Sequence, residues 1–319
     1  MKLYSIAVSG LLTMEMHSLN NEGTEGNHLM TRQVQVVDKG GKIHAVNAVS
    51  GDMFKHIQAE HLYNLAKEEG LPLCGPCSRF DANRISGDDE FASSFPEGVD
   101  DADILSGAIN RCLLDDAEGI LITRGIGKKS RSIGRKSAVE FGWVIGRPES
   151  TRTEAYFHVK YVPEGRGTGS GEGANLGQNI FHRPGSSGQY AVVLNLDLYR
   201  IGKNDISLEY VLDAGDRTSR LKALLKSVLF TFIKPGGAQR NTQCPHILAF
   251  EGCVSCSSST YPAPQASALN EDFQKEVEGV ANTLNSLKGG TITLYNFDSL
   301  SGFARIMEKL ITCIQPCGV

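Results

Sequence analysis

The sequence predicts an α+β fold, a ferredoxin-like or RRM βαββαβ domain with large insertions, on three observations. Strand and helix patterns follow one another in the order strand, helix, strands, helix, strand. The strongest strand pattern is the apolar run at 189–201. The clearest helix is 216–233, where apolar residues recur at i, i+3, i+4 and i+7. Long polar or glycine-rich stretches separate these elements, which indicates insertions.

The first elements are a strand, a hairpin and a helix. Residues 2–16 alternate as a long strand, and 18–27 read as a loop. Two short strands at 33–37 and 43–46 flank Asp-Lys-Gly-Gly, a good hairpin turn. Residues 49–69 form a helix in which Ser50 is a natural N-cap.

Residues 73–150 change character and predict an insertion or second lobe. An acidic segment, 88–103, holds seven acids and no base. A basic block, 124–136, holds six bases and no acid. Only short strands, at 117–123 and 139–145, are expected in this part of the chain.

The second half returns to regular patterns after one irregular stretch. An alternating strand at 155–162 leads into 163–188, which contains eight glycines and reads as the least structured part. The strand at 189–201 and the helix at 216–233 follow. The remaining expected elements are strands at 246–253 and 291–297 and helices at 270–287 and 303–313.

Composition limits the possible functions. The chain has 319 residues, of which 40% are hydrophobic, so it can bury a full core. Its 32 Lys and Arg against 36 Asp and Glu exclude a uniformly basic, histone-like binder but not a local basic patch. The sequence has no apolar run of the ~20 residues that a membrane helix needs. The apolar N-terminus lacks a signal-peptide cleavage site, so we expect a cytoplasmic protein without a membrane partner.

Four stretches are candidates for contacts to phosphate. Glycine amides, helix N-termini and cationic side chains are the groups that hold nucleic-acid backbones. Each stretch also has a structural interpretation. The stretch around Ser50 could be a helix N-cap, and the basic block at 124–136 a solvated loop. Phe181 could be an aromatic that anchors its loop, and the glycines at 236–237 could belong to a helix C-cap. The candidate residues are Asn47, Ser50, Gly51, Lys55 and His56; Arg124, Lys128, Lys129, Arg131, Arg135 and Lys136; Phe181, His182 and Arg183; and Gly236, Gly237 and Arg240.

The eight cysteines are expected to be reduced thiols or metal ligands rather than disulfides. Cys74 and Cys77 have zinc-ligand spacing, and with Cys112 they could hold a structural zinc whose fourth ligand is not identifiable. Cys-Gly-Pro-Cys also resembles a redox dithiol, but it follows a helix here instead of opening one. Cys253 and Cys256 are expected to be buried thiols. No cofactor is required by any motif.

The sequence contains no HExxH, no GxSxG and no HxE with a downstream PCxxC, and its histidines are scattered over different elements. We therefore predict that the protein is not an enzyme.

Taken in order, five stretches resemble one family, the DevR-type, or Cas-seven, backbone protein of type I-A and I-B CRISPR Cascade complexes. They span most of residues 1–255, and their order and spacing carry the resemblance. They are NAVSGDMFKH, CLLDDAEGILIT, KKSRSIGRKSAVEFG, QNIFHRPGSSGQYAVVLNLDLYRIG and KPGGAQRN.

The resemblance implies a hand-shaped molecule that polymerises along guide RNA and leaves bases free to pair with target DNA. Residues 1–72 and 189–319 would form an RRM-like palm, 73–150 the fingers and 151–188 a β-hairpin thumb. Phe181 would be the thumb's wedge between bases. The implied partners are guide RNA, target DNA, further copies of the chain and other Cascade subunits.

Three other interpretations remain open. The first is a metal-dependent, target-RNA-cleaving relative, and the second a zinc-stabilised nucleic-acid-binding autoregulator. A dithiol enzyme is the third. The acidic segment, including Asp100 and Asp101, is a candidate to meet a neighbouring copy's basic surface.

Overall fold

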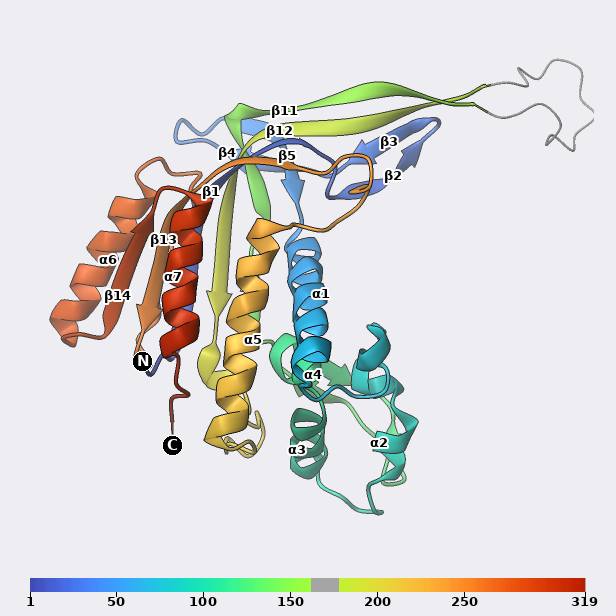
Figure 1. Cartoon of the computed structure of the whole chain (residues 1–319), viewed down its shortest axis with the longest axis vertical. Helices are drawn as coiled ribbons and strands as arrows, with labels where there is room; N and C mark the ends of the chain where they lie inside the picture. The colour runs from blue at the N-terminus through green and yellow to red at the C-terminus, as the bar shows by residue number, and fades with distance from the viewer. Residues whose placement is uncertain (162–177, 319) are drawn as a thin grey trace, which may run out of the picture.

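The computed structural model describes residues 1–161 and 178–318. Its main feature is one large β-sheet whose strands differ widely in length (Figure 1). The principal strands lie side by side in the order β14-β13-β1-β12-β11-β5-β4. Their bounds are β1 Ser5–His17, β4 Gln33–Val37, β5 Ile43–Val49, β11 Val144–Tyr161, β12 Gln178–Leu196, β13 His246–Ser257 and β14 Ile292–Phe297.

The centre of this sheet has the ferredoxin-like plan that the sequence predicts. Along the chain, β1 is followed by α1 (Gly51–Glu69), β11, β12, α5 (Ala214–Ile233) and β13. In space the four strands lie in the order β13-β1-β12-β11, and all three neighbouring pairs are antiparallel. The fourth, first, third and second strands of a βαββαβ unit therefore lie side by side, which confirms the predicted fold class.

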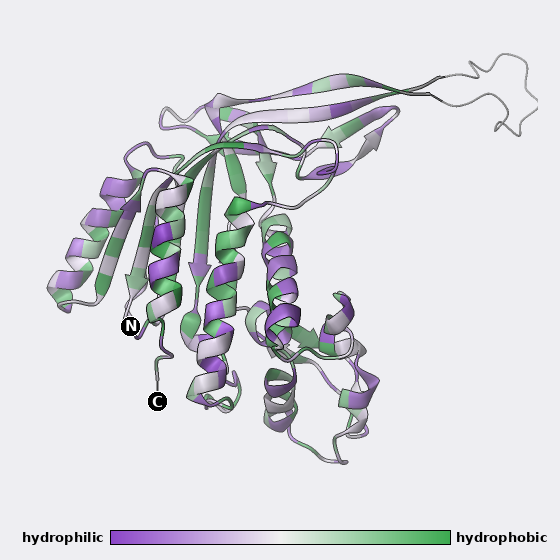
Figure 2. Ribbon diagram, in the orientation of Figure 1, coloured by the Kyte–Doolittle hydropathy of each residue, from purple (hydrophilic) through white to green (hydrophobic). Residues whose placement is uncertain are grey.

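One face of the sheet packs on helices to form the main core. The apolar strands lie behind α1, α5 and α7 (Leu300–Cys313) in Figure 1, and Figure 2 shows their mostly apolar colouring. Phe232 of α5, Phe250 of β13 and Phe303 of α7 pack against one another with ring centroids 4.7–5.5 Å apart. These rings join α7 to the βαββαβ unit.

The opposite face of the sheet is partly covered by the chain itself. Side chains alternate along β1, so Ser9 and Leu11 point away from the helical core. The Ala266 amide donates to Ser9 Oγ at 3.0 Å, and Ser255 Oγ donates to the Pro264 carbonyl at 2.6 Å. The segment that leads into α6 (Phe273–Leu287) thus occupies part of the face on which an RRM commonly stacks bases.

A second lobe follows α1 and has its own apolar cluster, which includes Ile85, Phe91, Leu105 and Ile109. Short helices build it, where only short strands were expected: the predicted strand at 117–123 is reduced to Ile120–Ile122. Helices of one to three turns show too little periodicity to be recognised in sequence. The lobe's elements are η1 Cys77–Arg79, η2 Arg84–Gly87, α2 Asp89–Ser93, α3 Asp101–Arg111, α4 Leu113–Glu118, β6 Ile120–Ile122, β7 Gly125–Ile126, β8 Lys129–Ser130 and β9 Ile133–Arg135.

A long hairpin of β11 and β12 projects from the body of the molecule (Figure 1). Its register runs from Thr151↔Gly188 to Tyr161↔Gln178. Phe181 to Arg183 therefore belong to strand β12, although the sequence placed them in a glycine-rich loop. Glycine and serine weaken a strand's sequence pattern, whereas pairing with β11 provides its hydrogen bonds. Residues 162–177 of the predicted irregular stretch lie outside the described part of the chain.

Smaller strands complete the sheet. β10 (Val139–Phe141) pairs with β12 below the hairpin. β2 (Asn21–Glu25) and β3 (His28–Thr31) form a second hairpin. The sequence predicted a loop at 18–27, where β2 lies, because the residues there do not alternate between polar and apolar. In the described ranges, no helix is long and apolar enough to span a bilayer.

Candidate nucleic-acid interface

Two of the predicted segments meet beside the middle of the described hairpin. The loop that follows α5 lies against β12: Arg183 Nη1 donates to Thr242 Oγ1 at 3.1 Å, and Gln243 Nε2 donates to the Pro184 carbonyl at 2.8 Å. These bonds bring the Phe181–His182–Arg183 unit beside the Pro-Gly-Gly-Ala-Gln-Arg loop. We call residues 19–20, 47–51, 181–184 and 235–243 together the junction.

The start of α1 joins the junction through the end of β1. The Leu19 carbonyl accepts from the Ala238 amide at 3.1 Å, and Asn20 Oδ1 accepts from the Ser50 amide at 2.8 Å. A Cβ on Gly237 would lie 3.0 Å from the Leu19 carbonyl oxygen, so glycine permits this close approach. Stretches far apart in sequence therefore pack together at the junction, although Leu19, Asn20 and Ser50 are themselves buried.

Stacked rings extend this surface along the hairpin. The His182 ring stacks on His28 of β3, with centroids 4.1 Å apart, and Phe157 meets His182 edge-on at 5.8 Å. Phe181 stacks on His158 at 5.6 Å, and the Arg183 guanidinium lies 4.8 Å from the Phe181 ring centre. His28, Phe157 and His158 were not among the predicted site residues. Only the cross-strand register, which sequence does not give, pairs them with Phe181 and His182.

The residues at the start of α1 have internal roles. Asn47 is buried: it donates to Thr31 Oγ1 and to the Arg32 carbonyl, and it accepts from the Tyr190 hydroxyl at 2.9 Å. Ser50 Oγ accepts from the Met53 amide as the helix N-cap. Their hydrogen bonds support the structural interpretation of these positions.

Gly51, Lys55 and His56 lie on the first turns of α1. A Cβ on Gly51 would lie 2.5 Å from the Phe141 carbonyl, so this position is closely packed. Lys55 Nζ donates to the Glu118 carbonyl at 3.1 Å and to Ser137 Oγ at 2.8 Å, and burial lowers the pKa of its ammonium. Of these three residues, only His56 is exposed, and its ring lies 5.4 Å from that of Phe80.

The basic block is paired with the acidic segment of the same chain. Arg124 lies 2.7 Å from Asp89, and Lys128 lies 2.7 Å from Glu97. Arg131 lies 2.6 Å from Asp101 and also donates to the Val99 and Ile126 carbonyls. The charges that looked available for a phosphate, or for a neighbouring copy, are thus largely matched inside one lobe.

Arg135 belongs to a buried network rather than to the surface. Asp116 accepts from Arg135 at 2.6 Å and from Arg220 of α5 at 2.9 Å, and all three side chains are buried. Arg135 also lies 3.1 Å from Asp205. This network holds the second lobe to α5.

Within the described residues, five lysine and arginine side chains of the predicted set form no ion pair: Lys55, Lys129, Lys136, Arg183 and Arg240. Lys129 and Lys136 are exposed on the second lobe, and Arg240 is half-buried in the junction. Gly236 and Gly237 lie beside Arg240 on the same loop. Together with Arg183 and His182, this loop is the part of the predicted site that can still offer donors to a phosphate backbone.

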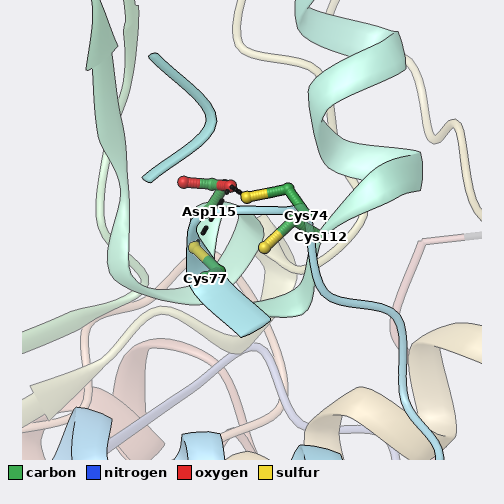
Figure 3. Close-up of side chains that lie close together, drawn as sticks. All are labelled: Cys74, Cys77, Cys112 and Asp115. Carbon is green, nitrogen blue, oxygen red and sulfur yellow. Dashed lines mark hydrogen bonds between the residues drawn. The ribbon is translucent and has the colours of Figure 1, made fainter. Parts of the chain in front are cut away.

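The structure also groups the three cysteines predicted as metal ligands. The sulfur atoms of Cys74, Cys77 and Cys112 and one carboxylate oxygen of Asp115 all lie within 4.8 Å of one another, and all four residues are buried (Figure 3). Asp115 is a candidate for the fourth ligand that the sequence left unidentified. Cys253 and Cys256 are buried in β13, and burial raises the pKa of both thiols.

Comparisons with known proteins give one family. Residues 8–278 match the family model described as "CRISPR-associated negative auto-regulator DevR/Csa2". No curated protein matches the chain significantly.

Solved structures with a similar arrangement of elements share little sequence with the chain. Two are chains from structures titled "CRISPR RNA-guided surveillance complex, pre-nicking" (14% identity, TM-score 0.47, covering 97% of this chain and 99% of that one) and "CRISPR RNA-guided surveillance complex" (12%, 0.46, 97% and 98%). A third is Csc2 of Thermofilum pendens, with 13% identity and a TM-score of 0.42, covering 96% of this chain and 84% of that one.

Proposed function

Because this chain belongs to the CRISPR-associated DevR/Csa2 family, we propose that it is a guide-RNA-binding backbone subunit of a type I Cascade complex, of subtype I-B. In this role, copies of the chain polymerise along the guide RNA with the other Cascade subunits. The assembly presents the guide for pairing with target DNA in the cytoplasm. The chain itself is non-catalytic in this proposal.

The projecting hairpin is the observation that carries the proposal. Phe157 is 60% exposed, Val159 45% and Ile180 41%, so apolar side chains lie uncovered along both strands. Grouped apolar exposure on a protruding element is typical of a surface that another molecule covers. A second copy bound to the same RNA is the partner that fits a repeating assembly.

The junction is the proposed RNA contact. It offers the Gly237 amide, the Arg240 and Arg183 guanidinium groups, and stacked rings at Phe181 and His182, whereas Gly236 on the same loop is buried. Such groups bind phosphate and sugar, or wedge against a base, without reading a particular sequence. That suits a subunit that must accept any guide, because base pairing with the target supplies the specificity.

The covered sheet face supports the same proposal. An RRM that reads sequence stacks bases on its open sheet. Here Ser9 and Ser255 on that face bind the segment at 264–266 instead. A guide held at the junction by its backbone would keep its bases available for pairing.

The test is assembly on RNA. The protein is co-produced with an RNA that contains a CRISPR repeat, and the complex is sized by chromatography with A260/A280, then treated with RNase or DNase. We expect a large assembly that RNase and high salt dissociate. A protein-only monomer or dimer in the presence of both the RNA and its partner subunits would overturn the proposal.

Matched variants locate the contact. Phe157→Ser is expected to shorten the assembly, because it removes an exposed apolar side chain from the hairpin. Leu121→Ser removes one of similar exposure, 55%, from the second lobe and is expected to leave the assembly unchanged. Cleavage of bound target RNA that requires a divalent metal would instead favour the cleaving alternative. Preference for a duplex operator over single-stranded RNA would favour the autoregulator.

A further inference from the structure

We propose that Cys74, Cys77, Cys112 and Asp115 bind one zinc ion that fixes the second lobe to the end of α1. The inference does not depend on the proposed RNA binding. It rests on the spatial grouping of four residues from two separate stretches of the chain.

The distances suit a tetrahedral zinc site. Cys74 Sγ lies 3.4 Å and Cys77 Sγ 3.7 Å from Asp115 Oδ2. With zinc bonds of about 2.3 Å to sulfur and about 2.1 Å to oxygen, neighbouring ligand atoms of a tetrahedron lie roughly 3.6 Å apart. The four side chains point toward one common centre (Figure 3). Little movement is needed to place an ion among them.

The charge balance of the site also calls for a cation. Asp115 is 1% exposed and forms no ion pair in the described ranges, whereas the adjacent Asp116 is bound by two arginines. Its oxygens face thiols and the amide of Ile85. A divalent ion would stabilise this carboxylate together with thiolates in a setting where isolated charge is costly.

The chemistry of the ligands selects among metals. Three thiolates favour zinc over magnesium or calcium, which prefer oxygen ligands throughout. A four-iron cluster attaches each ligand to a different iron atom and spreads the ligands further apart than a single ion does. Because all four ligand atoms lie within 4.8 Å of one another, a single ion fits this site better.

The position of the site gives the ion a structural task. Cys74 and Cys77 lie just after α1, where η1 begins, whereas Cys112 and Asp115 lie at the join of α3 and α4. The only regular elements between the two pairs are short helices. An ion there would close the long loop between the two pairs of ligands. It would thereby hold the short helices that form the lobe's apolar cluster in their places.

The experiment measures zinc bound to the full chain. The protein is purified from zinc-replete cells, and its metal content is determined by elemental analysis beside that of Cys112→Ser and Asp115→Ala. We expect one zinc per wild-type chain and near zero in both variants. Cys253→Ser changes a buried cysteine of another CxxC pair in β13 and is expected to keep its zinc.

A second measurement separates zinc loss from unfolding. Asp115→Cys supplies a fourth thiolate and is expected to retain the ion. After chelation, limited proteolysis should cut the wild-type chain within 73–143 while the sheet around β1 stays protected. Cobalt exchanged into the wild-type protein should give the thiolate charge-transfer band of a tetrahedral site.

Several results would overturn the inference. They are a wild-type protein that is folded but metal-free after zinc-replete growth, zinc that persists in Cys112→Ser, or zinc that is lost in Cys253→Ser. A disulfide between any two of the cluster's cysteines in the protein as purified would also refute it.

Discussion

The Arg131 guanidinium lies 2.6 Å from the Asp101 carboxylate of the same chain. Sequence alone shows a block of bases and a block of acids and leaves open where each finds its partner. The fold brings the two blocks together, so most of their charge is matched within one lobe. The junction, in contrast, keeps Arg183 and Arg240 without ion pairs in the described ranges.

Asp101→Asn should lower the free energy of unfolding by about 1 kcal/mol or less, because the carboxylate is half exposed and water screens its pair. Asp103→Asn is the control, since Asp103 is exposed and no ion pair involves it in the described structure. Denaturant unfolding measures both. Assembly on guide RNA should be unchanged by either substitution. Weakened assembly in Asp101→Asn would indicate that the acidic segment contacts a neighbouring copy.

Arg135→Ala and Lys136→Ala should behave differently although the residues are adjacent. Arg135 is paired to buried Asp116, and removing one partner of such a pair costs about 3–5 kcal/mol. Lys136 is exposed, and its removal should leave stability within about 0.5 kcal/mol of the wild type. Thermal unfolding distinguishes the two. Equal effects would contradict the described network.

His17 should make the fold sensitive to acid. Burial lowers the pKa of its imidazole from 6.5 to about 4, so the unfolded chain binds more protons than the folded chain between these values. The stability contributed by neutral His17 is therefore present above pH 6.5 and is lost as pH falls toward 4. The shift corresponds to about 3 kcal/mol.

His17→Phe isolates this effect from the carboxylates that titrate in the same range. Within the ranges that the structure describes, neither ring nitrogen of His17 has a hydrogen-bond partner, and the ring packs edge-on against Tyr190, so phenylalanine should be tolerated. Unfolding free energies measured from pH 7 to pH 4 should fall less steeply for the variant. Parallel slopes for the two proteins would assign the acid sensitivity elsewhere.

Arg240→Ala should weaken RNA binding without lowering stability. The side chain forms no ion pair in the described ranges, and a lost phosphate contact reduces the salt dependence of affinity by about one unit of slope. Arg305→Ala, an exposed residue on α7, is the control. Titration of labelled RNA at several salt concentrations checks both. An unchanged slope for Arg240→Ala would remove the loop from the proposed contact.

The main elements of the fold were predictable because their patterns are long. The helix at α5 repeats its apolar residues from Leu221 to Phe232, about three turns, and β1 alternates over most of its length. The second lobe was not predictable in detail, since helices such as α2 and α4 span only five or six residues. Their stability depends on tertiary packing rather than on local periodicity.

The candidate site shows the same division. Sequence identified Phe181, Arg183 and Arg240 by residue type, but it could not reveal that β11 places His158 opposite Phe181. It identified three cysteines but not Asp115, which is adjacent to Asp116 in the same helix. Only the folded structure distinguishes the two aspartates, because Asp115 faces the cysteines and Asp116 pairs with Arg135. The chemical type of each residue can be read from the sequence, whereas cross-strand register and burial can be determined only from the fold.

Strand β12 has a mechanical consequence. Its 19 residues pair with β1 and β10 in the body and with β11 out to Gln178, so no linker separates hairpin from sheet. Gly188, with a φ of +145°, lies where the pairing of β12 with both β1 and β11 shifts register. The angle between the hairpin and the sheet is therefore set by the backbone of a continuous strand. In a row of copies, that fixed angle would be repeated at every step and would help set the pitch of the filament.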